Sequence, residues 1–106
     1  MNITLEKSDN FDIIYLAYDN PFGGDKFHIY TTGFSFMVFD ENNHSLFNKD
    51  YVSRIRMLNN LCRAFKSQYN IDVEYVTDKH QLSPSYIAVE PKNNESLAKM
   101  KFYGFV

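Results

Sequence analysis

Residues 50–69, in the middle of the chain, read DYVSRIRMLNNLCRAFKSQY. The apolar side chains of this segment recur every three or four positions, which is the period of one face of an α-helix. Asn48 or Asp50 can cap the first turn, and Asn70 tolerates the left-handed conformation that commonly follows a last turn. The sequence therefore predicts one long helix over residues 50–69, with an apolar face made of Tyr51, Val52, Ile55, Leu58, Cys62, Phe65 and Tyr69.

The first half of the chain is predicted to be an antiparallel meander. Its apolar residues alternate or run together in short segments separated by turn formers, which is typical of strands. These segments are residues 2–7, 11–18, 27–31, 34–39 and, as a short edge strand, 44–47. The glycine-rich segment 19–25 is predicted to be a loop, and Gly33 marks either a tight turn or a bulge.

Beyond the long helix, residues 71–76 and 86–89 read as two further strands. Prolines on both sides of the second segment favour a place at the edge of the sheet. Residues 92–106 are predicted to form a short helix capped by Asn94, followed by a final strand at 101–105.

The expected fold class is α+β, with an antiparallel sheet of about five to six strands and one main helix, about 50–69, packed on one face. The 106 residues are 44% hydrophobic, 17% aromatic and 23% charged, which suits one globular domain over residues 1–106 and excludes a disordered chain. No apolar run reaches the roughly 18 residues of a membrane span, and the first residues lack the basic start of a signal peptide. We therefore expect no membrane contact and a cytoplasmic location. The single cysteine, Cys62, cannot form an internal disulfide and reads as a small buried residue.

Charge is unevenly distributed along the chain. The formal net charge is −2, but residues 1–50 hold three basic and eight acidic side chains, whereas residues 51–106 hold eight basic and five acidic ones. A pI near 5.8 argues against general nucleic-acid binding. Basic residues of the long helix and one phenylalanine of the glycine-rich loop are the candidates for contact with a protein partner: Phe22, Arg54, Arg56, Arg63 and Lys66. A solvated helix face that pairs locally with the acidic first half is the alternative interpretation.

One strand pattern points to a different function. Residues 33–39, GFSFMVF, resemble the RNP1 strand of RNA-recognition domains, and residues 14–16 resemble the beginning of their RNP2 strand. The resemblance implies that aromatic residues stack on unpaired bases while arginines contact phosphates, namely Tyr15, Phe34, Phe36, Arg56 and Arg63. The chain order of that fold is not met, because no helix is predicted between the two segments. Thr32 also stands where a basic residue is usual.

No motif in the sequence indicates catalysis or a bound metal. Acidic residues and histidine occur together in the turn at 40–44 and at Asp78 and His80, but neither spacing matches a recognised ligand set. The pair Gly23-Gly24 lacks the Lys-Ser or Lys-Thr that follows in a phosphate loop. We therefore expect no metal, no cofactor and no enzymatic activity.

Composition and these exclusions lead to a hypothesis for function. Asn, Lys, Ile, Phe and Tyr together supply 44 residues against 14 from Gly, Ala, Arg and Pro, a bias typical of AT-rich genes such as those of many phages and mobile elements. The leading hypothesis is a small non-enzymatic module that binds another protein, as a phage or mobile-element accessory protein that inhibits a host or defence factor. The alternative is a protein that binds single-stranded RNA or DNA. Under either hypothesis the chain could form a homodimer, through strand pairing at 44–47 or 85–90.

Overall fold

The computed structural model describes residues 3–7, 13–20, 23–77 and 86–106. The strands are β1 (Ile3–Lys7), β2 (Ile13–Asn20), β3 (Gly23–Thr31), β4 (Phe36–Phe39), β5 (Val73–Thr77) and β6 (Ile87–Pro91). They form one sheet in the order β1-β2-β3-β4-β6-β5, and every neighbouring pair is antiparallel. The helices are α1 (Tyr51–Tyr69) and α2 (Asn94–Tyr103), and a 3-10 turn, η1 (Leu46–Asn48), precedes α1. The fold class is α+β with an antiparallel sheet, as the sequence predicts.

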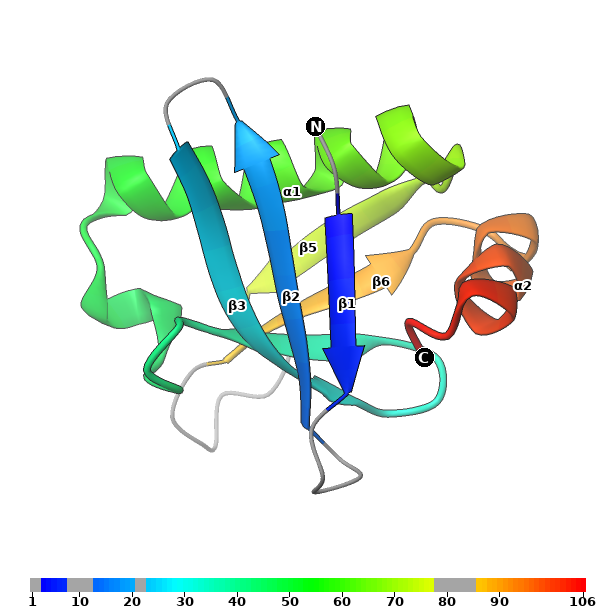
Figure 1. The fold of residues 1–106 in the computed structure, drawn as a ribbon, viewed down its shortest axis with the longest axis horizontal. Coiled ribbons are helices and arrows are strands. Elements are labelled where there is room, and N and C mark those ends of the chain that lie inside the picture. Colours follow the sequence, from blue (N-terminus) through cyan, green and yellow to red (C-terminus); the bar gives the residue numbers. More distant parts are fainter. Residues whose placement is uncertain (1–2, 8–12, 21–22, 78–85) are drawn as a thin grey trace.

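The sheet is strongly curved. In Figure 1, β1, β2 and β3 lie in front, while β5 and β6 pass behind them. The edges of the described sheet are β1 and β5, and α1 contacts both of them. One helix therefore lies beside both edges, where a curved sheet otherwise leaves backbone groups unpaired.

The hydrophobic core fills the space between the inner face of the sheet and the helices. Alternate residues of β3, β4 and β6 are buried, as expected where one face of a strand packs on a core. Phe65 of α1 packs against Phe36 of β4 and against Phe105, which follows α2, with ring centroids 5.8 and 4.9 Å apart. The buried side chains of α1 are Met57, Leu58, Leu61, Ala64 and Phe65.

The long helix begins and ends where its sequence predicts, but its buried face is different. The Asp50 carboxylate caps the first turn by accepting the N–H of Ser53 at 3.0 Å, and Asn70 ends the helix with a φ of 53°. Tyr51 and Val52 were expected in the apolar face that packs on the core, yet they are 68% and 73% exposed. Both residues belong to the first turn of α1, and in Figure 1 the start of α1 extends to the left past β3.

Two predictions for the first half are wrong. The predicted loop at 19–25 is too long, because β2 and β3 stay paired as far as Asn20 and Gly23. Residues 44–47 do not form an edge strand, because the Ser45 hydroxyl accepts the N–H of Phe47 at 3.2 Å and caps η1. Such a local side-chain bond competes with strand pairing.

The position of β6 corrects a further prediction. This strand lies between β4 and β5 and is not an edge, although it contains Pro91. Pro91 occupies the last position of the strand, opposite Val73, where a missing N–H removes at most one ladder hydrogen bond. Residues 44–47 and 86–90, the described part of the two segments predicted to pair with a second copy, are therefore not at an edge of the described sheet.

The last segment of the chain also differs from its prediction. No strand forms at 101–105, because α2 continues to Tyr103 and ends at Gly104, whose φ is 85°. Asn93 rather than Asn94 is the N-cap, and its side-chain oxygen accepts the N–H of Ser96 at 2.7 Å.

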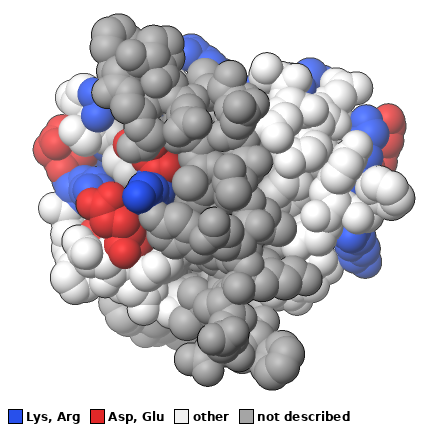
Figure 2. Space-filling view, viewed as in Figure 1, with Lys and Arg blue, Asp and Glu red and all other residues white. Residues whose placement is uncertain are grey.

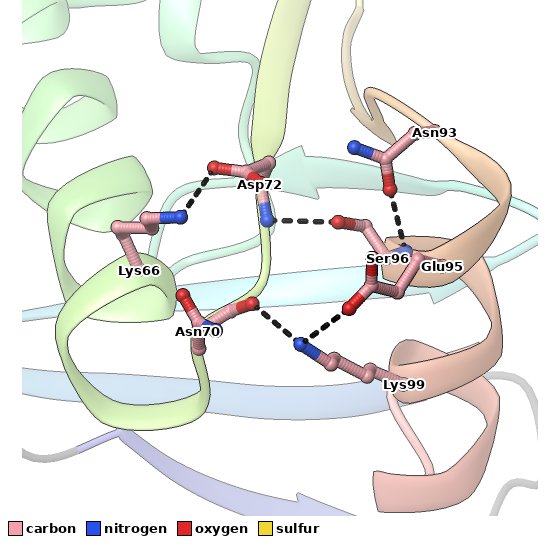
Figure 3. Close-up of polar contacts among 7 residues, drawn as sticks. All are labelled: Lys66, Asn70, Asp72, Asn93, Glu95, Ser96 and Lys99. Carbon is pink, nitrogen blue, oxygen red and sulfur yellow. Dashed lines mark hydrogen bonds and ion pairs between the residues drawn. The ribbon is translucent and has the colours of Figure 1, made fainter.

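A polar network joins the end of α1, the start of β5 and α2 (Figure 3). Lys66 of α1 pairs with Asp72 at 2.9 Å, and the N–H of Asp72 donates to the Ser96 hydroxyl at 3.0 Å. Lys99 donates to the carbonyl oxygen of Asn70 at 3.1 Å. These contacts fix α2 against the turn that connects α1 to β5.

Candidate functional site

The residues predicted to bind a protein partner lie in separate surroundings. Arg54 is half-buried, whereas Arg56 and Arg63 are exposed and two helical turns apart. Lys66 is exposed and held in its ion pair with Asp72. Phe22 lies outside the described residues. Arg54 and Arg56, two positions apart on α1, therefore point to nearly opposite sides of the helix, whereas Arg56 and Arg63 share one side.

Arg54 contacts the rings of Phe47 and Tyr51. We name these three residues, with the exposed Val52 that follows Tyr51 in the chain, the aromatic–arginine patch. The guanidinium carbon of Arg54 lies 4.8 Å from the ring centroid of Phe47 and 5.4 Å from that of Tyr51. Both distances fall within the roughly 6 Å range of cation–π attraction. The Nε atom of Arg54 is buried and has no hydrogen-bond acceptor among the described residues. Contact with the two rings therefore orients this side chain.

Charged residues precede and follow Tyr51 and Val52 in the first turns of α1. Asp50 precedes them, and its hydrogen bonds with Ser53, aided by the charge of Arg56, hold the pKa of the Asp50 carboxyl below its usual range. An apolar centre with a polar rim is the usual anatomy of a protein–protein interface. A carboxylate at the helix N-terminus also repels phosphate, which argues against nucleic acid at this position.

Charges of both signs are mixed on the face of the molecule drawn in Figure 2. Lysine and arginine lie beside aspartate and glutamate both at the left, near the start of α1, and at the right, near α2. A surface that follows a nucleic-acid backbone is expected to be mainly basic. The described side chains on this face do not form such a surface.

The outer face of the sheet carries a hollow beside Phe34, which we name the Phe34 hollow. Its apolar base is formed by Met37 of β4, Ala88 of β6 and Val76 of β5, which are neighbours in the strand register. The remaining lining residues are Thr32, Phe34, Ser35, Tyr86 and Glu90. Its volume of about 150 Å³ is below the roughly 300–1,000 Å³ of most small-molecule pockets, so it suits a single side chain better than a metabolite.

A tight turn presents Phe34 at the edge of this hollow. The N–H of Thr32 donates to the carbonyl oxygen of Ser35 at 2.9 Å, and the N–H of Ser35 donates to the Thr32 hydroxyl at 3.1 Å. Gly33 between them has a φ of 92°, in the left-handed region. The turn leaves Phe34 61% exposed, between the Phe34 hollow and a broader depression of about 370 Å³ lined partly by Lys92.

The aromatic residues predicted to stack on bases do not form a common surface. Phe36 is fully buried and packs against Phe65, so its prediction as a base-stacking residue is wrong. Tyr15 lies in β2 opposite His28, but its side chain is outside the described part of the structure. Phe34 is exposed, and a lone phenylalanine does not make the stacking platform that RNA-recognition domains use.

Two of the groups considered for catalysis and metal binding, Cys62 and the turn at 40–44, have structural roles. Burial raises the pKa of the Cys62 thiol, so the thiol is protonated at neutral pH and is a poor nucleophile. The Asp40 carboxylate accepts the N–H groups of Asn42 and His44 at 2.9 and 2.8 Å, which stabilises the predicted turn. In the described ranges, no three or more His, Cys, Asp or Glu side chains are arranged to hold a metal ion. The other cluster, at residues 78–80, lies outside those ranges.

Comparison with known proteins gives no relative: no family model matches the chain, and no match was found among curated proteins or solved structures. Within the described segments, no helix combines the length and the apolar character needed to cross a membrane. A function for this chain must therefore be argued from the chemistry of its surface.

Sequence reasoning missed three members of the aromatic–arginine patch, Phe47, Tyr51 and Val52. The helical period placed Tyr51 and Val52 in the core because periodicity does not show where the sheet ends. One signal was present, since Tyr51 and Arg54 are three positions apart and such pairs meet on a helix surface.

Proposed function

We propose that this chain is a non-enzymatic module that docks on another protein through the aromatic–arginine patch. The observation that carries the proposal is the placement of the Arg54 guanidinium against the rings of Phe47 and the exposed Tyr51, which is followed in the chain by the exposed Val52. Tyrosine and arginine are enriched among the residues that dominate binding energy at protein interfaces. Because Phe47 and Tyr51 already order Arg54, less conformational entropy is lost when a partner binds.

The patch favours a partner surface with an apolar centre and an acidic group at its edge. Tyr51 and Val52 supply apolar contact, while the exposed Arg56 can meet a carboxylate through its bidentate fork. The amino-acid bias of the chain supports the further proposal that it is a phage or mobile-element accessory protein and that the partner is a host factor which it inhibits.

Another exposed apolar group is weaker as a candidate. Phe102 and Tyr103 at the end of α2 are exposed, with ring contacts to each other and between Tyr103 and Tyr69. No cation–π contact is found there among the described residues, so this group lacks the ordered arginine that distinguishes the aromatic–arginine patch.

The proposal is tested by affinity capture of host proteins with the wild-type chain and with Val52→Asp, in lysate treated with nuclease. Val52 lies in the first turn of α1, where an added carboxylate is favourable to the helix dipole, so the variant should keep its fold. We expect a discrete protein partner with the wild type and a loss of at least about tenfold with Val52→Asp, because a charge replaces the apolar side chain that the partner would bury. Ser67→Ala, an exposed change on the same helix, is the matched control and should retain the partner.

Two results would overturn the proposal. Capture that is unchanged by Val52→Asp would place any docking surface elsewhere on the chain. Recovery of nucleic acid, with the protein signal lost after nuclease, would instead favour the single-strand-binding alternative. In that case Arg63→Ala and Phe34→Ala become the next variants to compare.

A further inference from the structure

We propose that Arg54 of the aromatic–arginine patch is the binding site for a carboxylate of the partner protein, supplied by an aspartate, a glutamate or the C-terminal end of its chain. The inference rests on the proposed docking at this patch and names the chemical group that the partner brings to it. It is distinct from a contact at the exposed Arg56, which points to nearly the opposite side of α1.

Arg54 is a charged side chain that is partly withdrawn from water and has no acid beside it. It is half-buried, and among the described residues no carboxylate lies within ion-pair distance of its guanidinium. By contrast, Lys66 and Lys99 are paired with Asp72 and Glu95, at 2.9 and 3.3 Å. A charge that leaves bulk water without an opposite charge is costly, so the Arg54 site gains stability from a carboxylate.

The acidic residue closest to Arg54 in the helix does not fill this role. The Asp50 carboxylate serves as the helix cap and accepts the N–H of Ser53 at 3.0 Å. Arg56, and not Arg54, is the arginine whose charge helps to lower the pKa of the Asp50 carboxyl. The guanidinium of Arg54 is therefore directed to the two aromatic rings rather than to Asp50.

The outer end of the Arg54 guanidinium is the part that a ligand can reach. Nε is buried without an acceptor among the described residues, whereas the two Nη groups are not enclosed. The Nη groups carry the remaining N–H donors of a planar fork that matches the two oxygens of a carboxylate. Because the rings of Phe47 and Tyr51 hold this fork in place, a carboxylate meets donors that are already oriented.

The surroundings favour a carboxylate that is carried on a protein surface. Residues 49–56 hold three basic side chains and one acidic side chain, so this segment has a formal charge of +2 and attracts an anion. Tyr51 and Val52 are exposed, and their apolar contact is available to a protein and not to a free inorganic anion. The Asp50 carboxylate repels a phosphate, which carries more charge, more strongly than it repels a single carboxylate.

The experiment is a titration of the isotope-labelled protein with benzoate, followed by NMR at the side-chain Nε–H signals of arginine. The chain has three arginines, so the signals of Arg56 and Arg63 are internal references for that of Arg54. We expect a saturable shift of the Arg54 signal and smaller shifts of the other two. Benzamide, which has nearly the same shape and no charge, should bind at least about fivefold more weakly, because charge-assisted hydrogen bonds are roughly twice as strong as neutral ones.

A conservative variant and a matched control identify the group responsible. Arg54→Lys keeps the charge and loses the planar fork, so it should weaken benzoate by at least about threefold, measured at the backbone amides of residues 47–54. Lys101→Met removes a positive charge at an exposed position of α2 and should leave the affinity unchanged. The decisive comparison of benzoate with benzamide uses the wild-type protein and does not depend on the folding of any variant.

Three results would each overturn the inference: no saturable shift at Arg54, equal shifts of all three arginine signals, or equal affinity for benzoate and benzamide. The docking proposal is judged separately, by the capture experiment with Val52→Asp. If Val52→Asp abolishes capture and Arg54→Met does not, the partner docks without a carboxylate at Arg54, and only the present inference fails. If Val52→Asp leaves capture unchanged, docking at the patch fails and the assignment of a partner carboxylate fails with it, whatever the benzoate titration shows.

Discussion

Gly33 determines how Phe34 is presented to solvent. Its φ of 92° lies in a region that side chains other than glycine seldom adopt, and a Cβ built at this position meets nothing within 4 Å. A substitution therefore strains the backbone without a steric clash. We expect Gly33→Ala to lower the free energy of unfolding by about 1–2 kcal/mol, the usual cost of a left-handed alanine.

Urea denaturation of wild type and Gly33→Ala measures this loss. Gly33→Asn is the matched comparison and should cost less, because asparagine tolerates positive φ better than alanine. Equal stability of all three proteins would mean that the turn can relax to another conformation. Phe34 would then not be held in a fixed position beside its hollow.

Single residues also show why part of the surface was not predictable from sequence. Tyr51 and Val52 satisfy the helical period as well as Leu58 does, yet only Leu58 faces the sheet. The period reports which side of a helix is apolar and not how far the opposing sheet extends. The Phe34 hollow was missed for a related reason, since its base of Met37, Ala88 and Val76 depends on strand pairings that local sequence does not encode.

The start of α2 offers a direct test of helix capping. Asn93 accepts the N–H of Ser96 at 2.7 Å, whereas Asn94 is an exposed residue of the first turn. We expect Asn93→Ala to lower the free energy of unfolding by about 1 kcal/mol, the typical value for a lost N-cap. Asn94→Ala should be nearly neutral, and thermal melts of the two variants measure the difference.

A comparable loss from both alanine variants, or a larger loss from Asn94→Ala, would contradict this assignment of the cap. Asn93→Ser provides a rescue, because a serine hydroxyl accepts the same N–H bond. The two asparagines are adjacent and both are good caps, so the sequence alone could not distinguish them. The geometry of the β6–α2 connection decides which one precedes the first turn.

Strands and helices were otherwise predictable to different degrees. The helix over 50–69 and the strands at 71–76 and 86–89 follow from strong local periodicity, and all three exist close to their expected bounds. The error at 44–47 has a local cause, the Ser45 cap, that overrides strand propensity. The error at 101–105 arises because aromatic residues in a short segment suit a helix end as well as a strand.

The ion pair between Lys66 and Asp72 links the end of α1 to the network that holds α2. The hydrogen bond that the Asp72 carboxylate accepts from Lys66 lowers the pKa of this carboxyl. A carboxyl whose pKa is lower in the folded state than in the unfolded state, where it is about 3.9, stabilises the fold at pH above about 3.9. This stabilisation is lost as the pH falls through the folded-state pKa. We expect Lys66→Met to move the pKa of Asp72 upward in an NMR titration.

The matched control is Lys101→Met, which removes an exposed charge from α2 and should leave the pKa of Asp72 in place. The stability difference between wild type and Lys66→Met should be present at neutral pH and vanish in acid. It should also shrink at high salt, because both partners are solvent-exposed. A difference that persists at low pH would indicate lost packing of the lysine stem instead.

The core depends on one residue that joins distant parts of the chain. Phe105 is buried after α2, and its ring meets Phe65 and Tyr69 of α1 at 4.9 and 5.1 Å. We expect Phe105→Ala to lower the free energy of unfolding by about 3–5 kcal/mol, the range for a buried phenylalanine. Phe102→Ala, at an exposed position of the same segment, should change it by about 0.5 kcal/mol or less.

Chemical denaturation of the two variants separates these cases. Similar small effects would mean that the end of the chain packs loosely on α1. Such a result would remove the link between the two helices that Phe105 provides, and the polar network of Figure 3 would then be the main connection.

The insertion of β6 between β4 and β5 sets the order in which the sheet can assemble. The β1–β2, β2–β3, β3–β4 and β5–β6 pairs join consecutive strands, whereas β4 and β6 pair residues about fifty positions apart, such as Met37 and Ala88. The chain between β4 and β6 must close into a loop before the contacts between these strands contribute any stability. The entropy cost of closing this loop therefore raises the free energy of the folding transition state. We therefore expect the pairing of β4 with β6, which also forms the base of the Phe34 hollow, to limit the rate of folding. The hollow would then exist only in molecules that have completed the slowest step.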